Sequence, residues 1–217
     1  MKLIHTIYEP VGPGPHPTII AFHGWGANAL DLLGIAPYLV HGQFLTICPQ
    51  GPLTVPLGST NGYGWFPLRP GSPPDDAAVI AAIGEAADFI AEASARYPID
   101  ARRLVALGFS QGGIVALGVA LSNPDKFAAL VGISTWFPEG LKQIASARGE
   151  RRLPALIQHG SNDSLIEIGR ARESVERLRQ MNLDLHYREY DCGHEITGQG
   201  LQHLSAFLTE KVLDGAA

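Results

Sequence analysis

Residues 103–121 read Arg103-Leu-Val-Ala-Leu-Gly108-Phe-Ser110-Gln-Gly-Gly113-Ile-Val-Ala-Leu-Gly-Val-Ala-Leu121. The run up to Gly108 is short and apolar, as a strand covered on both faces is. The run after Gly113 is apolar and long enough for a buried helix. Between them, glycines leave room for a sharp turn, because a Cβ there would collide with the neighbouring strand and helix. The stretch therefore predicts a strand, a tight turn and a helix in direct succession.

The same alternation of short apolar runs and longer helical patterns continues along the chain, and it predicts an α/β fold with a mostly parallel central sheet and helices on both faces. The expected strands are Leu3–Ile7, Thr18–Phe22, Phe44–Cys48, Arg103–Gly108, Ala128–Ser134, Ala155–His159 and Leu183–Tyr190. The expected helices are Asp75–Tyr97, Gln111–Ser122, Glu167–Met181 and Gly200–Leu213, with a weaker one at Asn28–Val40. We expect one domain over residues 1–217, since this length suits a single α/β unit.

Composition excludes several classes of protein. The chain has 217 residues, 46% of them hydrophobic and 17% charged, which is typical of a globular protein. A net charge of −5 without a basic block argues against nucleic-acid binding. The two cysteines, Cys48 and Cys192, are too few for a disulfide scaffold or a cysteine zinc site, and the sequence assigns neither a role. No apolar run is long enough for a membrane span and no secretory signal is visible, so we expect a cytoplasmic protein.

One segment, Gly51–Pro74, interrupts the alternation. It is long, rich in glycine and proline, and contains Tyr63, Trp65 and Phe66. Long loops in compact domains are usually functional or disordered, and three aromatic residues argue against disorder. We expect this loop to line a site; the alternative is that it only covers the edge of the sheet.

Gly108-Phe-Ser110-Gln-Gly112 fits the pattern Gly-x-Ser-x-Gly. The pattern alone is weak, and a serine that caps a helix would also satisfy it. Its position between a strand and a helix is decisive, because a serine on such a turn projects from the carboxyl edge of the sheet. Ser110 is therefore the candidate nucleophile.

A serine nucleophile needs a base and a third group that fixes the tautomer of the base. On a strand–turn–helix scaffold of this kind the chain order is Ser, then Asp or Glu, then His. Asp163 and His194 each follow an expected strand and so reach the same edge as Ser110. Asp191 is a weaker rival as the acid, being too near His194 in sequence. His23 and His159 end strands and are expected to be structural hydrogen-bonding groups.

Acyl transfer also needs two fixed N–H donors for the developing oxyanion. The residue after the nucleophile, Gln111, supplies one. The other is expected from the turn His23-Gly24-Trp25-Gly26, with Trp25 as its carrier, although a plain glycine-rich turn would look the same.

These motifs together resemble the small phospholipase/carboxylesterase family, the bacterial relatives of acyl-protein thioesterases. The residues that carry the resemblance are His23-Gly24-Trp25-Gly26, Cys48-Pro49-Gln50-Gly51-Pro52, Trp65-Phe66, Gly108-Phe-Ser-Gln-Gly-Gly113, His159-Gly160 with Asp163, and Gly193-His194. The resemblance implies an α/β-hydrolase domain without a lid domain and without a cofactor. It also implies Ser110 as nucleophile, Asp163 as acid, His194 as base, and oxyanion amides at Trp25 and Gln111.

The chain departs from the family pattern around the expected acyl pocket. Trp25 stands where leucine is usual, Ala27 where aspartate is common, and Pro67 where an acid is common. We expect Trp65 and Phe66 to shape the substrate pocket. Trp136 is expected there as well, although a simple apolar turn would explain it equally. The stretch between Ala128–Ser134 and Ala155–His159 is short, which leaves room for one short helix and no lid domain.

The sequence thus predicts a serine hydrolase that cleaves short-to-medium acyl esters, without a metal, since no His-Glu-x-x-His or comparable ligand set occurs. One alternative is an acyl-thioesterase that uses the same site. Another is a catalytically silent binding module, which would have no need of Ser, Asp and His at three strand ends. The expected partner is a small ester or thioester. The sequence leaves the oligomeric state open, with a homodimer among the alternatives.

Overall fold

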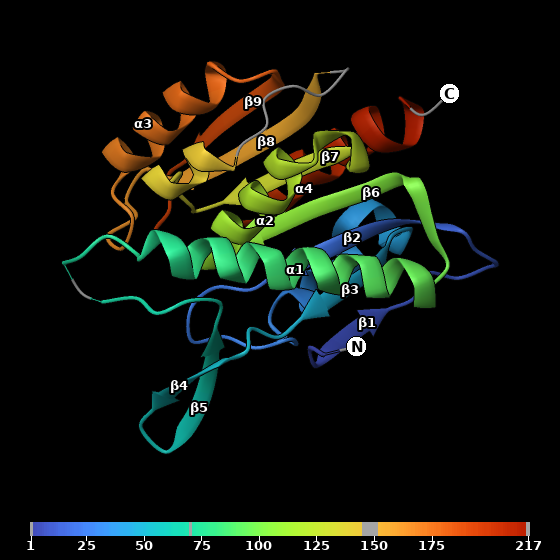
Figure 1. Ribbon diagram of the computed structural model, residues 1–217. Helices are drawn as coiled ribbons and strands as arrows, with labels where there is room; N and C mark the ends of the chain where they lie inside the picture. Colours follow the sequence, from blue (N-terminus) through green and yellow to red (C-terminus); the bar gives the residue numbers. More distant parts are fainter. Residues whose placement is uncertain (1, 70, 145–151, 216–217) are drawn as a thin grey trace.

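The computed structural model describes residues 2–69, 71–144 and 152–215, and its centre is a seven-stranded sheet (Figure 1). The strand order is β1-β3-β2-β6-β7-β8-β9, in which β1 is antiparallel to β3 and every other pair is parallel. The expected mostly parallel sheet is confirmed. The strands are β1 His5–Tyr8, β2 His16–Phe22, β3 Leu45–Pro49, β6 Ile99–Phe109, β7 Ala129–Ile133, β8 Leu153–Gly160 and β9 Leu183–Tyr190.

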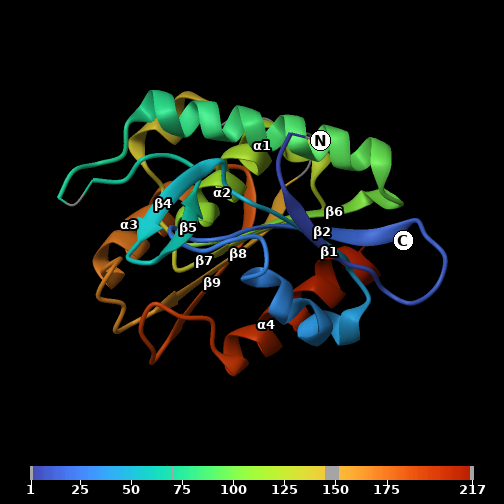
Figure 2. The same cartoon turned by 90° about the horizontal axis from the view of Figure 1, so that it is seen from below.

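Helices cover both faces of this sheet, as Figure 2 shows. One face packs against α1 (Asp76–Arg96), α2 (Gln111–Ser122) and α3 (Ile168–Arg179). The other face packs against η1 (Leu32–Gly42), α4 (Gly198–Leu208) and η4 (Thr209–Asp214). Along β2, Ile20 and Phe22 join the first core, whereas Ile19 and Ala21 join the second. This alternation is the two-residue period of a strand buried on both sides.

The expected helix at Asn28–Val40 is only partly correct. In its place lies η1, a 3-10 segment that contains Pro37 and bends near its end. Val40 and His41 have φ of 46° and 55°, in the left-handed region that β-branched residues rarely adopt. Proline lacks an N–H donor and so interrupts a regular helix, which accounts for the irregular form.

The expected loop at Gly51–Pro74 is a two-stranded hairpin over much of its length. Strands β4 (Leu53–Leu57) and β5 (Thr60–Gly64) pair antiparallel and project from the body of the molecule (Figure 1). Gly58 and Ser59 connect them, and Gly58 has a φ of 64°. A glycine–serine pair between two five-residue runs is a hairpin signal, and it was visible in the sequence.

The described part of the stretch between β7 and β8 contains one short helix, η3 (Glu139–Gln143), in line with the expected short helix. Residues 145–151 of that stretch lie outside the described residues. For them, the expectation that the chain has no lid domain stays a prediction from the sequence. Within the described ranges, none of the helices has both the length and the apolar character needed to cross a bilayer.

Candidate functional site

Ser110 occupies a strained turn between β6 and α2. Its φ of 54° and ψ of −119° lie outside the regions that side-chain-bearing residues prefer. Hydrogen bonds hold the turn from two directions: Ser110 N donates to Ile133 O at 2.9 Å, and Thr135 Oγ1 donates to Ser110 O at 2.8 Å. A Cβ on Gly108 would overlap the Gly112 carbonyl, so the turn requires glycine there. The expected sharp strand-to-helix turn is therefore present at Ser110.

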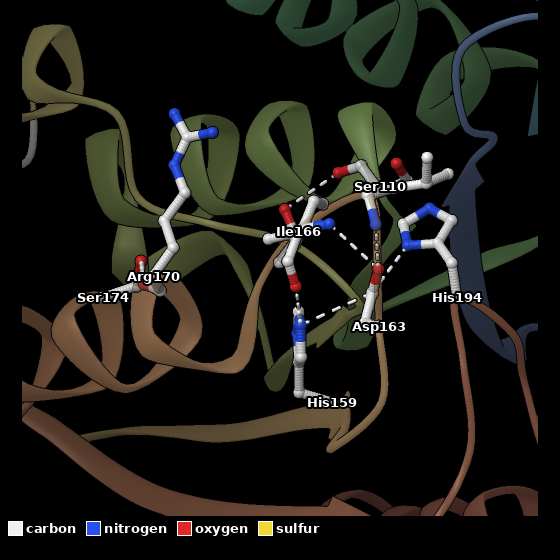
Figure 3. Close-up of polar contacts among 9 residues, drawn as sticks. Ser110, His159, Asp163, Ile166, Arg170, Ser174 and His194 are labelled. Atoms are coloured by element: carbon white, nitrogen blue, oxygen red, sulfur yellow. Dashed lines mark hydrogen bonds and ion pairs between the residues drawn. The ribbon is translucent and has the colours of Figure 1, made fainter.

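Asp163 and His194 meet at the same edge of the sheet, because they follow the adjacent parallel strands β8 and β9. His194 Nδ1 lies 2.7 Å from Asp163 Oδ2, and Figure 3 shows the two side chains facing each other beside Ser110. A carboxylate only accepts hydrogen bonds, so Nδ1 carries the ring hydrogen and Nε2 is left as an acceptor. This is the tautomer that a general base for a serine hydroxyl requires.

Ser110 and His194 lie on the wall of one cavity. The His194 ring packs against Phe109, the residue before Ser110, with 4.9 Å between ring centroids. In the described part of the chain no hydrogen bond joins the Ser110 hydroxyl to His194. Such contacts are often long in unliganded enzymes and shorten when substrate binds. The structure thus brings all three residues to one place, with the acid–base pair already formed.

The carboxylate of Asp163 is buried yet fully supplied with donors. Burial alone would raise its pKa, but hydrogen bonds from Ile166 N, His194 and Leu165 N outweigh it and hold the pKa below its usual value. The two backbone donors both reach Oδ1 at 2.9 Å, which leaves Oδ2 for His194. Asp163 is therefore ionised at neutral pH and has a fixed orientation.

His159 is a second buried histidine beside this carboxylate. Its Nε2 lies 2.7 Å from Ile166 O and 3.4 Å from Asp163 Oδ2. Both neighbours are acceptors, so Nε2 carries the ring hydrogen. His159 thus ties β8 to the loop that donates to Asp163, and the expected structural role is confirmed. His23 is the matching case at the end of β2: its Nε2 accepts from Gly51 N at 3.0 Å, and burial lowers its pKa.

The turn that carries Trp25 is fastened to the hairpin. Gly26 N donates to Tyr63 O at 2.8 Å, and Tyr63 N donates to Ala27 O at 2.8 Å, so this turn pairs with β5 as a short antiparallel bridge. A Cβ on Gly64 would overlap the Trp25 ring, so this ring packs directly on the backbone of β5. Trp25 lines the cavity that contains Ser110. Sequence reasoning missed this attachment because it treated residues 51–74 as a loop.

The side chain of Gln111 fixes the other end of the same hairpin. It is fully buried, its Oε1 accepts from Trp65 N at 2.9 Å, and its Nε2 donates to Phe66 O at 2.6 Å. Trp65 also donates from Nε1 to His23 O at 2.9 Å. Gln111, expected only as a backbone donor, therefore has a side chain that joins the elbow to the segment after β5.

The cavity beside Ser110 has a volume of about 570 Å³. Trp136 lies on its wall, as expected, whereas Trp65 and Phe66 do not. These two side chains are 4% and 1% exposed and belong to the core between the sheet and α1 and α2. They point inward because β5 and Gln111 anchor their backbone. The lining residues not expected from the sequence include Asp31, Leu68, Phe109, Leu165, Ile166 and Arg170.

Comparison with known proteins adds a family to this geometry. A family model described as Phospholipase/Carboxylesterase matches residues 5–212. Acyl-protein thioesterase 1 of Mycosarcoma maydis is 27% identical over 93% of this chain and 93% of its own length. Acyl-protein thioesterase 1 of Cryptococcus neoformans var. neoformans serotype D is also 27% identical, over 84% of this chain and 77% of its own length. The Bacillus cereus carboxylesterase has the same fold, with a TM-score of 0.79 and 20% identity over 100% of this chain and 95% of that one.

Because the pKa of Asp163 is lowered in the folded chain, this residue should affect the stability of the fold at acid pH. A carboxyl group whose pKa is lower in the folded than in the unfolded chain stabilises the fold above its unfolded pKa, near 3.9, and loses that contribution as the pH falls through its folded pKa. Asp163→Asn removes the titration. We expect the Tm difference between wild type and Asp163→Asn to shrink between about pH 5 and pH 2. A difference that is constant over this range would contradict the assignment, and Asp125→Asn, at an exposed position, is the control.

The two hydrogen bonds of the buried Gln111 side chain should contribute to the thermal stability of the fold. Gln111→Met keeps the length of the side chain but leaves Trp65 N–H and Phe66 C=O without their partner. Each unpaired buried group costs about 1–3 kcal/mol, so we expect a Tm lower by several degrees in thermal unfolding followed by circular dichroism. Gln202→Met, at an exposed position of α4, should leave Tm nearly unchanged. Equal Tm values for both variants would show that the bridge to the hairpin is unimportant.

Proposed function

Because the chain belongs to the phospholipase/carboxylesterase family of α/β-hydrolases, which are serine hydrolases, we propose that it cleaves carboxylic esters through Ser110, His194 and Asp163. One observation carries the assignment of these residues. A preformed Asp163–His194 hydrogen bond of 2.7 Å stands on the same cavity as a serine in a strained turn. A binding module has no use for a buried, ionised carboxylate that fixes the tautomer of a histidine beside a serine.

In the proposed reaction, His194 Nε2 takes the proton of the Ser110 hydroxyl as Oγ attacks the ester carbonyl carbon. The carbonyl oxygen becomes an oxyanion, which the backbone N–H groups of Trp25 and Gln111 stabilise. The protonated His194 then gives its proton to the departing alcohol, and an acyl-enzyme remains on Ser110. Water then gives a proton to His194 and attacks the acyl carbon. The bond between this carbon and Ser110 Oγ breaks, the acid is released, and His194 returns the proton to Oγ.

Two features support an ionised Asp163 as the partner of the protonated imidazole. Its charge lies 2.7 Å from His194 Nδ1, and its other oxygen accepts hydrogen bonds from two backbone N–H groups. The imidazolium formed during the reaction therefore meets a fixed negative charge that needs no rearrangement. The N-terminus of α2 begins at Gln111, directly after Ser110, and its partial positive charge favours the oxyanion.

The walls of the cavity support esters of short to medium acyl length. Trp25, Phe109, Trp136 and Leu165 give it a mostly apolar lining. Each buried methylene contributes about 0.8 kcal/mol, so affinity should rise with chain length until the acyl chain meets the wall. Two relatives are named acyl-protein thioesterases, which supports thioesters as a second class of substrate for the same residues.

Replacing the nucleophile tests the proposal directly. Ser110→Ala should abolish hydrolysis of 4-nitrophenyl butyrate, with a loss on the order of 10⁶ in turnover. Ser134→Ala is a matched control, because Ser134 directly follows the neighbouring strand β7 with a similar φ of 47° and does not line this cavity. It should keep activity. A loss below tenfold in Ser110→Ala would remove Ser110 from its role.

A panel of substrates tests the proposed acyl range. We expect kcat/KM on 4-nitrophenyl esters to rise from acetate, pass through a maximum at short to medium length and then fall. We expect no jump in rate as a substrate passes its solubility limit. Butyryl-thiocholine beside butyryl-choline compares thioester with ester. Rates that climb steeply on emulsified long-chain triglyceride, with little turnover of soluble butyrate or hexanoate, would contradict the proposed range.

A further inference from the structure

The four arginines of α3 differ in their partners. Arg172 donates to Glu189 at 2.8 Å, Arg177 donates to Glu139 at 2.7 Å, and Arg179 pairs with Glu176. Arg170 is the exception: among the described residues its guanidinium makes no hydrogen bond and no ion pair. It lies instead over the ring of Trp136, 4.4 Å from the ring centroid. A planar guanidinium stacked in this way keeps its N–H donors free at the edge.

This unpaired cation stands on the wall of the catalytic cavity. Arg170 and Trp136 line the cavity of about 570 Å³ that also contains Ser110 and His194. Figure 3 shows Arg170 rising from α3 on one side of the group, with Ser110 and His194 on the other. Partial burial lowers its pKa and the charge of Glu173 raises it, but the group remains a cation at any physiological pH. Arg170 is exposed, so its free N–H donors are accessible to an anion that a ligand supplies.

None of the carboxylates near the cavity that belong to the described residues forms an ion pair with Arg170, although the charge of Glu173 acts on it. Asp31 is the carboxylate on the wall of the same cavity, but it directly precedes η1, which packs against β2 and β3. Arg170 belongs to α3, which packs against β8 and β9. Since β6 and its Ser110 stand between these two pairs of strands, the carboxylate and the guanidinium lie on opposite sides of the nucleophile. Asp76, Glu139 and Glu173 line a neighbouring cavity of about 390 Å³, and Arg170 and Trp136 stand on the wall that this cavity shares with the catalytic one.

We propose that Arg170 is an anion-binding residue of the substrate site, and that the preferred substrates are esters carrying a carboxylate on the part of the molecule that lies along Trp136. The fork of the guanidinium suits a carboxylate with two parallel hydrogen bonds, while the ring of Trp136 holds the guanidinium in place. The inference rests on the proposed ester hydrolysis at Ser110 and adds to it a class of substrate. Arg170 acts on binding and specificity, and the chemical step remains with Ser110 and His194.

Matched pairs of esters that differ only in charge test this assignment. The first pair carries the charge on the acyl side: the mono-4-nitrophenyl ester of adipic acid against 4-nitrophenyl hexanoate. The second pair carries it on the alcohol side: the hexanoyl ester of glycolate against that of glycolamide. The measured quantity is the ratio of kcat/KM for the anionic ester to that for its neutral partner. One charge-assisted contact changes binding by about tenfold to a hundredfold.

Arg170→Gln should lower this ratio at least tenfold on one pair, and that pair shows which half of the ester lies along Trp136. Arg179→Gln is the matched control, since it removes one positive charge from the same helix at a residue outside the cavity. Its ratio should equal that of wild type. Arg170→Met keeps a flexible apolar side chain beside Trp136 while removing the charge, and it allows the same measurement if the glutamine variant does not fold. The wild-type ratio should also fall as salt is added.

Two negative results are distinguishable. If Arg170→Gln and Arg170→Met change the ratio no more than Arg179→Gln does on both pairs, the anion site is wrong while ester hydrolysis stands. If the neutral esters are not hydrolysed, or are hydrolysed equally by Ser110→Ala, the proposed function itself fails.

Discussion

The left-handed turn at Ser110 is the constraint on which the site depends. A residue with a side chain is held at a φ of 54° because it joins β6, a strand inside the sheet, directly to α2, which packs against one face of that sheet. The turn closes only because Gly108 and Gly112 lack side chains. A Cβ on Gly108 would overlap the backbone of Gly112, and a Cβ on Gly112 would overlap the carbonyl group of Phe22. The packing of a whole layer therefore supplies the free energy that keeps one hydroxyl at the edge of the sheet.

The hairpin β4–β5 extends this constraint to the opposite wall of the cavity. On one side, its backbone pairs with Ala27. On the other side, the segment after it forms two hydrogen bonds with the Gln111 side chain: Trp65 N donates to Oε1, and Phe66 O accepts from Nε2. The turn that carries Trp25 and the first residue of α2 are thus positioned by the same short segment. The two backbone donors proposed for the oxyanion, those of Trp25 and Gln111, are more precisely placed when a common element holds both.

Charge around the site is distributed unevenly, and the unevenness agrees with the proposed chemistry. Asp163 is buried but satisfied by two backbone donors and by His194, so its negative charge is fixed beside the ring that takes up a proton in the proposed reaction. Arg170 is the opposite case, a cation stacked on Trp136 with its donors unused by the described residues. The first charge serves the enzyme's own hydrogen-bond network, and the second is available to a ligand.

The sequence by itself determined the parallel sheet, the elbow at Ser110 and the order in which Asp163 and His194 follow their strands. These features are local: a two-residue period, glycines at a turn, and a polar residue at the end of an apolar run. Only the tertiary structure decided that Trp65 and Phe66 face the core and that the Gln111 side chain forms hydrogen bonds with a segment 45 and 46 residues away. It also decided that Arg170 is the arginine of α3 that forms no ion pair with a carboxylate of the described residues. Those outcomes depend on contacts between segments far apart in the chain, and no local pattern specifies which distant groups will be neighbours once the layers pack.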